Sequence, residues 1–343
     1  MPKRRSSKRI KIHSPRPDKT RRTKALVTGS VALGAYLTGA VVRWARRSTL
    51  YRPEELPPAM KAPIREQELM EGRARFYERE GTGVPLVLLH SFNAAASSYE
   101  MKPIFEHVAA TTDRPLYALD WFGFGLSDRP PVHYRPALFQ RQLRRFLSEY
   151  VNEPADVVAL SLGAAYAAVV AAEAPFLVRK VVLIAPIGLS RSNKRSLAQR
   201  AFFELADSAG AFELLFYRLT RRDSIRRFYT DKVFSDSTEA PHALVNYAFL
   251  TMHVRGAHHA PRRFLDGTLF ITEQVRHAYA TLRRPTLIVA PEQDERLAQS
   301  FEALTDVAAQ NDAYIQIHTL PTGLLPHWEA PEAFFDLLDD FLA

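Results

Sequence analysis

The stretch from Asp156 to Ala165 constrains the fold of this chain more than any other segment. It reads Asp-Val-Val-Ala-Leu-Ser-Leu-Gly-Ala-Ala, so an apolar run stops at a serine and small residues follow at once. Val157 and Val158 favour a strand covered on both faces, and the mostly small residues after Ser161 favour a helix packed closely on a sheet. Such a junction presents the serine hydroxyl at the carboxyl edge of the sheet, beside the free N–H groups of the new helix. From this pattern alone, an ordinary exposed serine in a loop fits equally well.

Four further apolar runs repeat the strand pattern, at residues 84–89, 116–119, 181–184 and 286–289. Helix-like stretches such as 137–150 separate several of them. Strand–helix alternation with uniformly apolar strands predicts a mostly parallel sheet with helices on both faces. We therefore expect an α/β core made of residues 66–189 and 283–343, with short strands within 66–80, a half-covered strand at 314–318 and an amphipathic helix at 331–342.

The alternation breaks between residues 190 and 282. This segment has helical patterns rich in aromatic residues and holds fourteen Lys or Arg against nine acids. An insertion between two strands of one sheet predicts a helical cap over the strand ends. The aromatic side chains could form the core of the cap or line a lipophilic pocket, and the pattern leaves both readings open.

The positive charge of the chain is confined to its beginning. The formal net charge is +9, yet residues 1–24 hold eleven Lys or Arg against the single acid Asp18, so the remaining residues sum to about −1. We predict a disordered basic tail over 1–24 and no nucleic-acid binding by the globular part. The absence of cysteine excludes disulfides and thiol chemistry, and no clustered carboxylates accompany the histidines, so we expect neither a metal nor another cofactor.

Residues 25–42 form an uncharged stretch of eighteen residues that Arg43 closes. As a helix it would span about 27 Å, close to the hydrocarbon thickness of a bilayer. We predict an uncleaved membrane anchor followed by a linker over 43–65, with the N-terminus cytoplasmic and the globular domain on the opposite side. A cleaved signal or transit peptide and a surface-lying helix are the alternatives.

Several motifs in order make the chain resemble the α/β-hydrolase superfamily, in particular its capped members. His90-Ser91-Phe92 is similar to the oxyanion loop of the family, and residues 120–127 match its Asp-x-x-Gly-x-Gly-x-Ser turn. The serine at 161, the insertion, and the Pro-His-x-Glu sequence at 326–329 continue the series over residues 66–343. The resemblance implies an α/β-hydrolase fold.

The resemblance also assigns roles to particular residues. It places Ser161 at the nucleophile, and it gives the oxyanion hole to the backbone N–H groups of Phe92 and Leu162. Asp294 stands at the acid position, although Pro291 occupies a family glycine. Ser91 likewise replaces a glycine, which costs free energy if that position needs a positive φ.

The general base is where the match fails. The family ends its last strand with Gly-His-x-Pro, and this chain has Leu324 at the histidine position. Leucine cannot accept a proton, and loss of one triad member removes most of the rate. His327 follows three residues later and could serve only if the loop were rearranged.

Two functions remain open at this point. The first is a membrane-anchored serine hydrolase that acts on a lipophilic ester or a related bond, with an atypical or impaired triad. The second is a non-catalytic homologue that binds a hydrophobic ligand or a partner.

Overall fold

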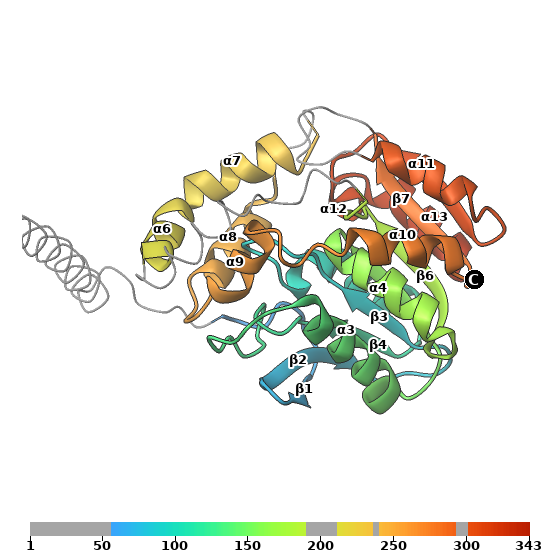
Figure 1. Ribbon diagram of the computed structural model, residues 1–343, viewed down its shortest axis with the longest axis horizontal. Coiled ribbons are helices and arrows are strands. Elements are labelled where there is room, and N and C mark those ends of the chain that lie inside the picture. The colour runs from blue at the N-terminus through green and yellow to red at the C-terminus, as the bar shows by residue number, and fades with distance from the viewer. Residues whose placement is uncertain (1–55, 190–210, 236–239, 293–300) are drawn as a thin grey trace, which may run out of the picture. The chain divides into compact units, whose positions relative to one another are not determined.

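The computed structural model describes residues 56–189, 211–235, 240–292 and 301–343 (Figure 1). The expected basic tail, the expected anchor at 25–42 and most of the linker lie outside these residues, as does Asp294. Within the described ranges, no helix is long and apolar enough to cross a bilayer.

One sheet organises the described part of the chain. Its eight strands run in the order β1-β2-β4-β3-β5-β6-β7-β8. The first three of these, β1, β2 and β4, pair antiparallel with one another, and every later neighbouring pair is parallel. The strands are β1 (Ile64–Leu69), β2 (Gly72–Arg79), β3 (Leu86–Leu89), β4 (Leu116–Leu119), β5 (Ala155–Leu160), β6 (Val178–Ile184), β7 (Thr286–Pro291) and β8 (Ile315–Leu320). The mostly parallel sheet and the positions of its strands confirm the prediction.

Helices cover both faces of this sheet. In Figure 1, α3 (Pro136–Arg145), α4 (Leu162–Glu173) and α10 (Thr272–Thr281) lie in front of the strands, and α3 and α10 both contact α4. On the other face α2 (Lys102–Thr111) joins α13 (Pro331–Leu342), because the His107 ring stacks on Phe335 at 4.0 Å and its Nε2 lies 2.9 Å from Asp339. The short α12 (Pro326–Glu329) contacts α2 and α13, and α11 (Glu302–Ala309) precedes β8.

The composition of α4 follows from its central position. Every residue from Leu162 to Ala171 is buried, because the sheet and two helices enclose the helix. Its alanines let these neighbours approach closely, and Gly163 is required at the first turn. A Cβ built on Gly163 would lie 2.4 Å from the carbonyl oxygen of His90, which is closer than any side chain tolerates.

The insertion is only partly a cap. Its helices α6 (Ala211–Leu219), α7 (Arg222–Lys232), α8 (His242–Met252) and α9 (His259–Leu265) gather at one end of the molecule (Figure 1). By contrast, α10 packs on α4, and the Tyr166 hydroxyl donates a hydrogen bond to the carbonyl of Leu269 at 2.8 Å. The last helix of the insertion, α10, therefore packs on the core helix α4, while the cap boundary at residue 282 stays a prediction.

Candidate active site

Ser161 lies at the end of β5 in a strained backbone conformation. Its φ is 58° and its ψ is −119°, a region that residues with a Cβ rarely adopt. Neighbouring backbone holds it there, since its N–H donates to Ile184 at 2.9 Å and its carbonyl accepts from Ile187. The side chain is half-buried. The structure thus forms the sharp strand-to-helix turn that the sequence predicted, with the strain located at the serine.

The loop after β3 lies directly beside this turn. The close approach of Gly163 to the His90 carbonyl brings the first turn of α4 against the start of the loop. The side chain of Phe92 is 1% exposed and anchors the loop in an aromatic cluster. Its ring lies 4.8–5.3 Å from those of Trp121, Phe124, Phe139 and Tyr166. The position of the Phe92 backbone is therefore fixed by core packing.

Two backbone donors are left available by this arrangement. Leu162 is the first residue of α4, and the first N–H groups of a helix have no partner within the helix. Among the described residues, neither the Leu162 N–H nor the Phe92 N–H has a hydrogen-bond acceptor. Free N–H groups of this kind are what an oxyanion requires.

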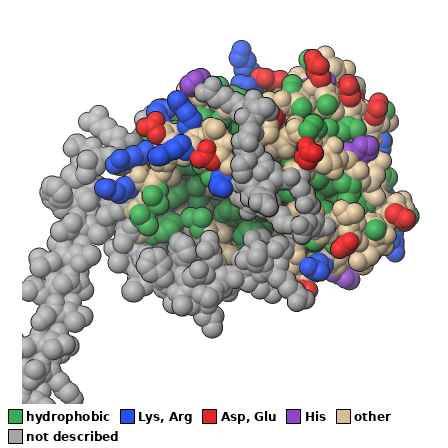
Figure 2. Space-filling model, turned by 90° about the horizontal axis from the view of Figure 1, so that it is seen from above, with side chains coloured by type: hydrophobic (Ala, Val, Ile, Leu, Met, Phe, Trp, Pro, Cys, Tyr) green, Lys and Arg blue, Asp and Glu red, His purple; other side chains and the backbone are tan. Residues whose placement is uncertain are grey.

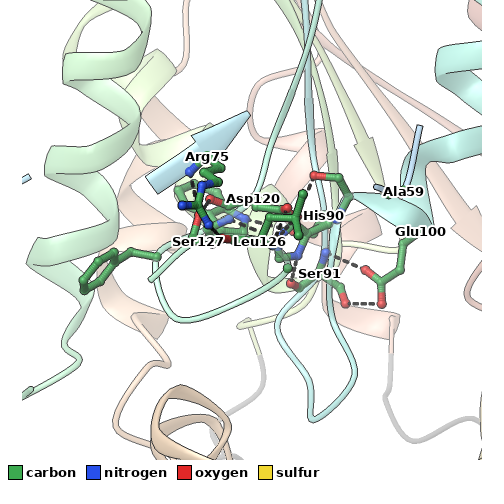
Figure 3. Close-up of polar contacts among 12 residues, drawn as sticks. Ala59, Arg75, His90, Ser91, Glu100, Asp120, Leu126 and Ser127 are labelled. Carbon is green, nitrogen blue, oxygen red and sulfur yellow. Dashed lines mark hydrogen bonds and ion pairs between the residues drawn. The ribbon is translucent and has the colours of Figure 1, made fainter. Parts of the chain in front are cut away.

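Ser91 is stabilised by a hydrogen bond from its hydroxyl. The sequence predicted a cost in free energy here if the position required a positive φ. It is not among the residues with positive φ in the described chain, so the position does not require glycine. Its N–H and its Oγ each donate to the carboxylate of Glu100, both at 2.9 Å (Figure 3). The Asn93 amide donates to the same carboxylate at 2.9 Å. These bonds hold the residues on both sides of Phe92.

Glu100 is a site residue that sequence reasoning missed. It lies in a short helical turn over Ser98–Met101 and is 3% exposed. Burial raises the pKa of its carboxyl, although hydrogen bonds from Ser91 and Asn93 oppose that shift. Nothing in the local sequence distinguishes this glutamate from an exposed one, because its donors come from the preceding loop.

His90 is committed to the structure of the loop. Its Nε2 accepts from the Trp121 N–H at 3.0 Å, so the proton is on Nδ1, which donates to the Ser91 carbonyl at 2.7 Å. The ring is fully buried, and burial lowers its pKa to about 3. Both nitrogens are occupied, which leaves His90 no means of accepting a proton from Ser161.

The glycine-rich turn after β4 is organised by one carboxylate. Asp120 accepts hydrogen bonds from the N–H groups of Ser98 and Leu126, both at 2.8 Å (Figure 3). A Cβ on Gly125 would lie 2.0 Å from this carboxyl group, so the second glycine of the motif makes room for it. The motif at residues 120–127 therefore supports the oxyanion loop through Ser98.

The segment at the expected histidine position is tied to the cap. The Leu324 N–H donates to the carbonyl of Val233, which follows α7, at 2.6 Å. The carboxylate of Glu329 accepts from the N–H of Ser235 at 3.0 Å and from that of Gly323 at 2.8 Å. A Cβ on Gly323 would lie 2.0 Å from the Val233 carbonyl. These contacts fix the loop against the cap.

His327 does not have the arrangement of a general base. Its Nε2 donates to the carbonyl of Glu100 at 2.7 Å, and Trp328 donates to the same oxygen at 2.8 Å. In a serine triad the corresponding nitrogen takes the proton of the nucleophile. Burial lowers the pKa of His327 to about 4, and its Nδ1 has no partner within the described residues. The structure gives no support to a catalytic role and places His327 as a support for Glu100.

The remaining expectations for the site are limited by the described ranges. The expected acid, Asp294, lies outside them, and β7 ends at Pro291 shortly before it. Within the described residues no group of three or more His, Asp or Glu side chains could hold a metal ion.

Comparison with known proteins gives consistent matches. A sequence profile described as Alpha/beta hydrolase family matches residues 86–337. The pyrrolizixenacetamide deacetylase of Xenorhabdus hominickii is 24% identical over 271 residues, which cover 77% of this chain and 92% of that protein.

Solved structures show the same fold. Cfl2 of Burkholderia cenocepacia is similar with a TM-score of 0.64 and 22% identity, over 85% of this chain and 100% of that one. A serine hydrolase involved in carbazole degradation has a TM-score of 0.61 and 19% identity, over 82% of this chain and 99% of that one. A probable hydrolytic enzyme of Pseudomonas aeruginosa has a TM-score of 0.63 and 18% identity, over 82% and 95%.

Proposed function

Because the chain belongs to the alpha/beta hydrolase family, we propose that it is a hydrolase in which the Ser161 hydroxyl is the nucleophile. The observation that carries this proposal is the positive φ of Ser161, a backbone conformation that costs free energy in a residue with a Cβ. A chain under no demand for an exposed hydroxyl at this turn gains stability by replacing it with glycine. The strain therefore supports a reactive role.

The proposed reaction is acyl transfer. Ser161 attacks the carbonyl carbon of a lipophilic ester or related bond, and the carbonyl oxygen takes up negative charge. The N–H groups of Phe92 and Leu162 stabilise that charge, and Glu100 keeps the Phe92 side of the hole in place through Ser91 and Asn93. Collapse of this tetrahedral adduct breaks the ester C–O bond, and the leaving group departs as an alcohol after taking up from solvent a proton equivalent to the one that the Ser161 hydroxyl gives up. Water then attacks the acyl-serine, which releases the carboxylic acid and restores the hydroxyl.

The proposed substrate class is argued from a relative, from the cap and from the N-terminal sequence. The relative from Xenorhabdus is named a deacetylase, which is an acyl-bond hydrolase. Within the described cap, most aromatic side chains are buried and form the cap's own core, including Phe212, Phe216, Tyr229 and Phe234. A lipophilic acyl group remains our proposal because the chain places an apolar segment at 25–42, which we propose anchors it with the hydrolase domain opposite the cytoplasmic face.

A second function is favoured by one specific observation. Leu324 stands at the histidine position, its loop is fixed to the cap, and both nearby histidines have an occupied Nε2. These features support a non-catalytic member that keeps the fold and cap to bind a hydrophobic ligand. In that case Asp294 has no catalytic partner.

A fluorophosphonate probe separates the two functions. We expect the wild-type protein to be labelled slowly and Ser161→Ala not at all. Leu324→His restores a base at the family position, and because general-base catalysis contributes roughly 100-fold to 10,000-fold, labelling should accelerate within that range. Absence of wild-type labelling between about pH 6 and 9, a range over which an unperturbed histidine changes from mostly protonated to deprotonated, favours the binding function.

A further inference from the structure

The outer surface of helices α6 and α7 exposes large apolar side chains. Leu215 and Leu219 are 44% and 60% exposed and lie one turn apart on α6, and Phe228 on α7 is 45% exposed. The neighbouring sides of both helices are buried, through Phe212 and Phe216 on α6 and through Ile225 and Tyr229 on α7. The exposed side chains of Leu215, Leu219 and Phe228 therefore contribute little to the stability of the fold. They are three of the six exposed large hydrophobic residues in the described chain.

Exposed positive charges without an ion-pair partner in the described part of the chain lie on the same two helices and the turn between them, although the Arg222 guanidinium also donates to Asn246. Six exposed cations lie between residues 218 and 232, against the acids Glu213, Asp223 and Asp231 on the same two helices. They are Arg218, Arg221, Arg222, Arg226, Arg227 and Lys232. Within the described residues none of the six forms an ion pair. Figure 2 shows Lys and Arg side chains gathered beside an apolar patch on this face.

We propose that this surface of α6 and α7 docks the cap on an anionic phospholipid membrane. Leucine and phenylalanine favour the acyl boundary, while arginine side chains reach lipid phosphates from the same depth. A nucleic acid would match the arginines but leave the exposed leucines without a partner, since its backbone is charged throughout. The combination of both side-chain types on one cap surface fits a lipid surface.

The first described residues of the chain pack beside the cap. Residues Ala59 and Met60 are buried there, because the Ala59 N–H donates to the Tyr77 hydroxyl and the Tyr247 hydroxyl of α8 donates to Pro57, both at 2.8 Å. Helix α8 also contacts α7, where the Arg222 guanidinium lies 4.0 Å from the Phe249 ring. The proposed docking surface therefore lies on a helix that packs against the core of the globular domain.

The absence of cysteine allows a direct test on the full chain. Single substitutions Leu219→Cys and Phe228→Cys carry an environment-sensitive fluorophore, and Met70→Cys, at a position 89% exposed in the turn between β1 and β2, is the control. The labelled proteins are reconstituted into vesicles of phosphatidylcholine alone or mixed with phosphatidylglycerol. We expect labels at 219 and 228 to move to an apolar environment and to be quenched by brominated lipid only with phosphatidylglycerol.

A second experiment tests the contribution of the positive charges to docking. Arg226→Gln with Arg227→Gln should reduce the ratio of docked to undocked protein roughly fivefold per residue, and added salt should do the same. The matched control is Arg135→Gln with Arg283→Gln, which removes two exposed arginines elsewhere and should change nothing.

Several outcomes would overturn the proposal. A label at 219 that stays in water with both lipids excludes docking, and equal quenching at position 70 shows unspecific adsorption. If duplex DNA moves the label to an apolar environment, the surface binds a nucleic acid. If raising the protein concentration in detergent does so, the surface binds a second copy of this chain. Carbonate extraction of the full chain tests the proposed anchor separately, so failure of the anchor and failure of the docking surface are distinguishable.

Discussion

Replacing Ser161 by glycine should make the protein more stable than replacing it by alanine. Both changes remove the hydroxyl, so the comparison isolates the backbone. Alanine keeps the Cβ that makes a φ of 58° with a ψ of −119° unfavourable, whereas glycine adopts this conformation freely. The turn cannot relax in the alanine variant, because hydrogen bonds to Ile184 and Ile187 hold it on both sides.

The magnitude follows from two opposing contributions. Relief of the strain is worth about 1–3 kcal/mol, and the extra freedom of glycine in the unfolded chain costs about 0.5–1 kcal/mol. We expect the free energy of unfolding of Ser161→Gly to exceed that of Ser161→Ala by about 0.5–2 kcal/mol. Urea unfolding followed by circular dichroism measures the difference.

A control at Ala164 gives the opposite sign. This residue is buried within α4, where Ala164→Gly should lower the free energy of unfolding by about 1 kcal/mol. If Ser161→Gly is no more stable than Ser161→Ala while Ala164→Gly behaves as expected, Ser161 is not strained. The main support for its reactive role would then be lost.

Three further predictions concern the groups around the site. Glu100→Gln should lower the free energy of unfolding by about 1–3 kcal/mol, because an amide cannot accept all three hydrogen bonds that the carboxylate accepts; unchanged urea stability would contradict this role. Burial lowers the pKa of His327 from 6.5 to about 4, so its contribution to stability is complete above the higher value and is lost as pH falls through the lower one. The variant His327→Gln keeps a donor for the Glu100 carbonyl but does not titrate. Between about pH 6.5 and pH 4 the free energy of unfolding of the wild type should therefore fall by up to about 3 kcal/mol relative to this variant, and parallel pH profiles would refute the burial of a neutral His327. Glu329→Gln should speed amide exchange roughly fivefold to thirtyfold at either Ser235 or Gly323, because the amide keeps one accepting oxygen and only one of the two N–H groups loses its acceptor; unaltered exchange at both would show that this carboxylate does not hold the loop to the cap.

The core of the fold was accessible from sequence because its signals are local. The parallel strands β3 to β7 each contain a continuous apolar run, since both of their faces are covered, and each of those runs is a strand in the structure. The edge strand β8 alternates instead, because it is only partly covered. The turn at Ser161 was equally accessible, because a strand, a serine and a row of small residues are consecutive in the chain. The role of α10 was not, because helical periodicity gives the length of a helix and not the neighbour on which it packs.

The candidate site likewise has features that local sequence predicts and features that depend on distant residues. The sequence by itself predicted Ser161 as the nucleophile, the N–H groups of Phe92 and Leu162 as oxyanion donors, and Leu324 in place of the family histidine, because these are properties of single positions within ordered motifs. Only the tertiary structure decided that Ser91 bonds a buried Glu100, that His327 supports the Glu100 carbonyl, and that the Leu324 loop is fixed to the cap. Hydrogen bonds of a buried polar group depend on which distant groups surround it after folding, and no local pattern in the chain encodes that neighbourhood.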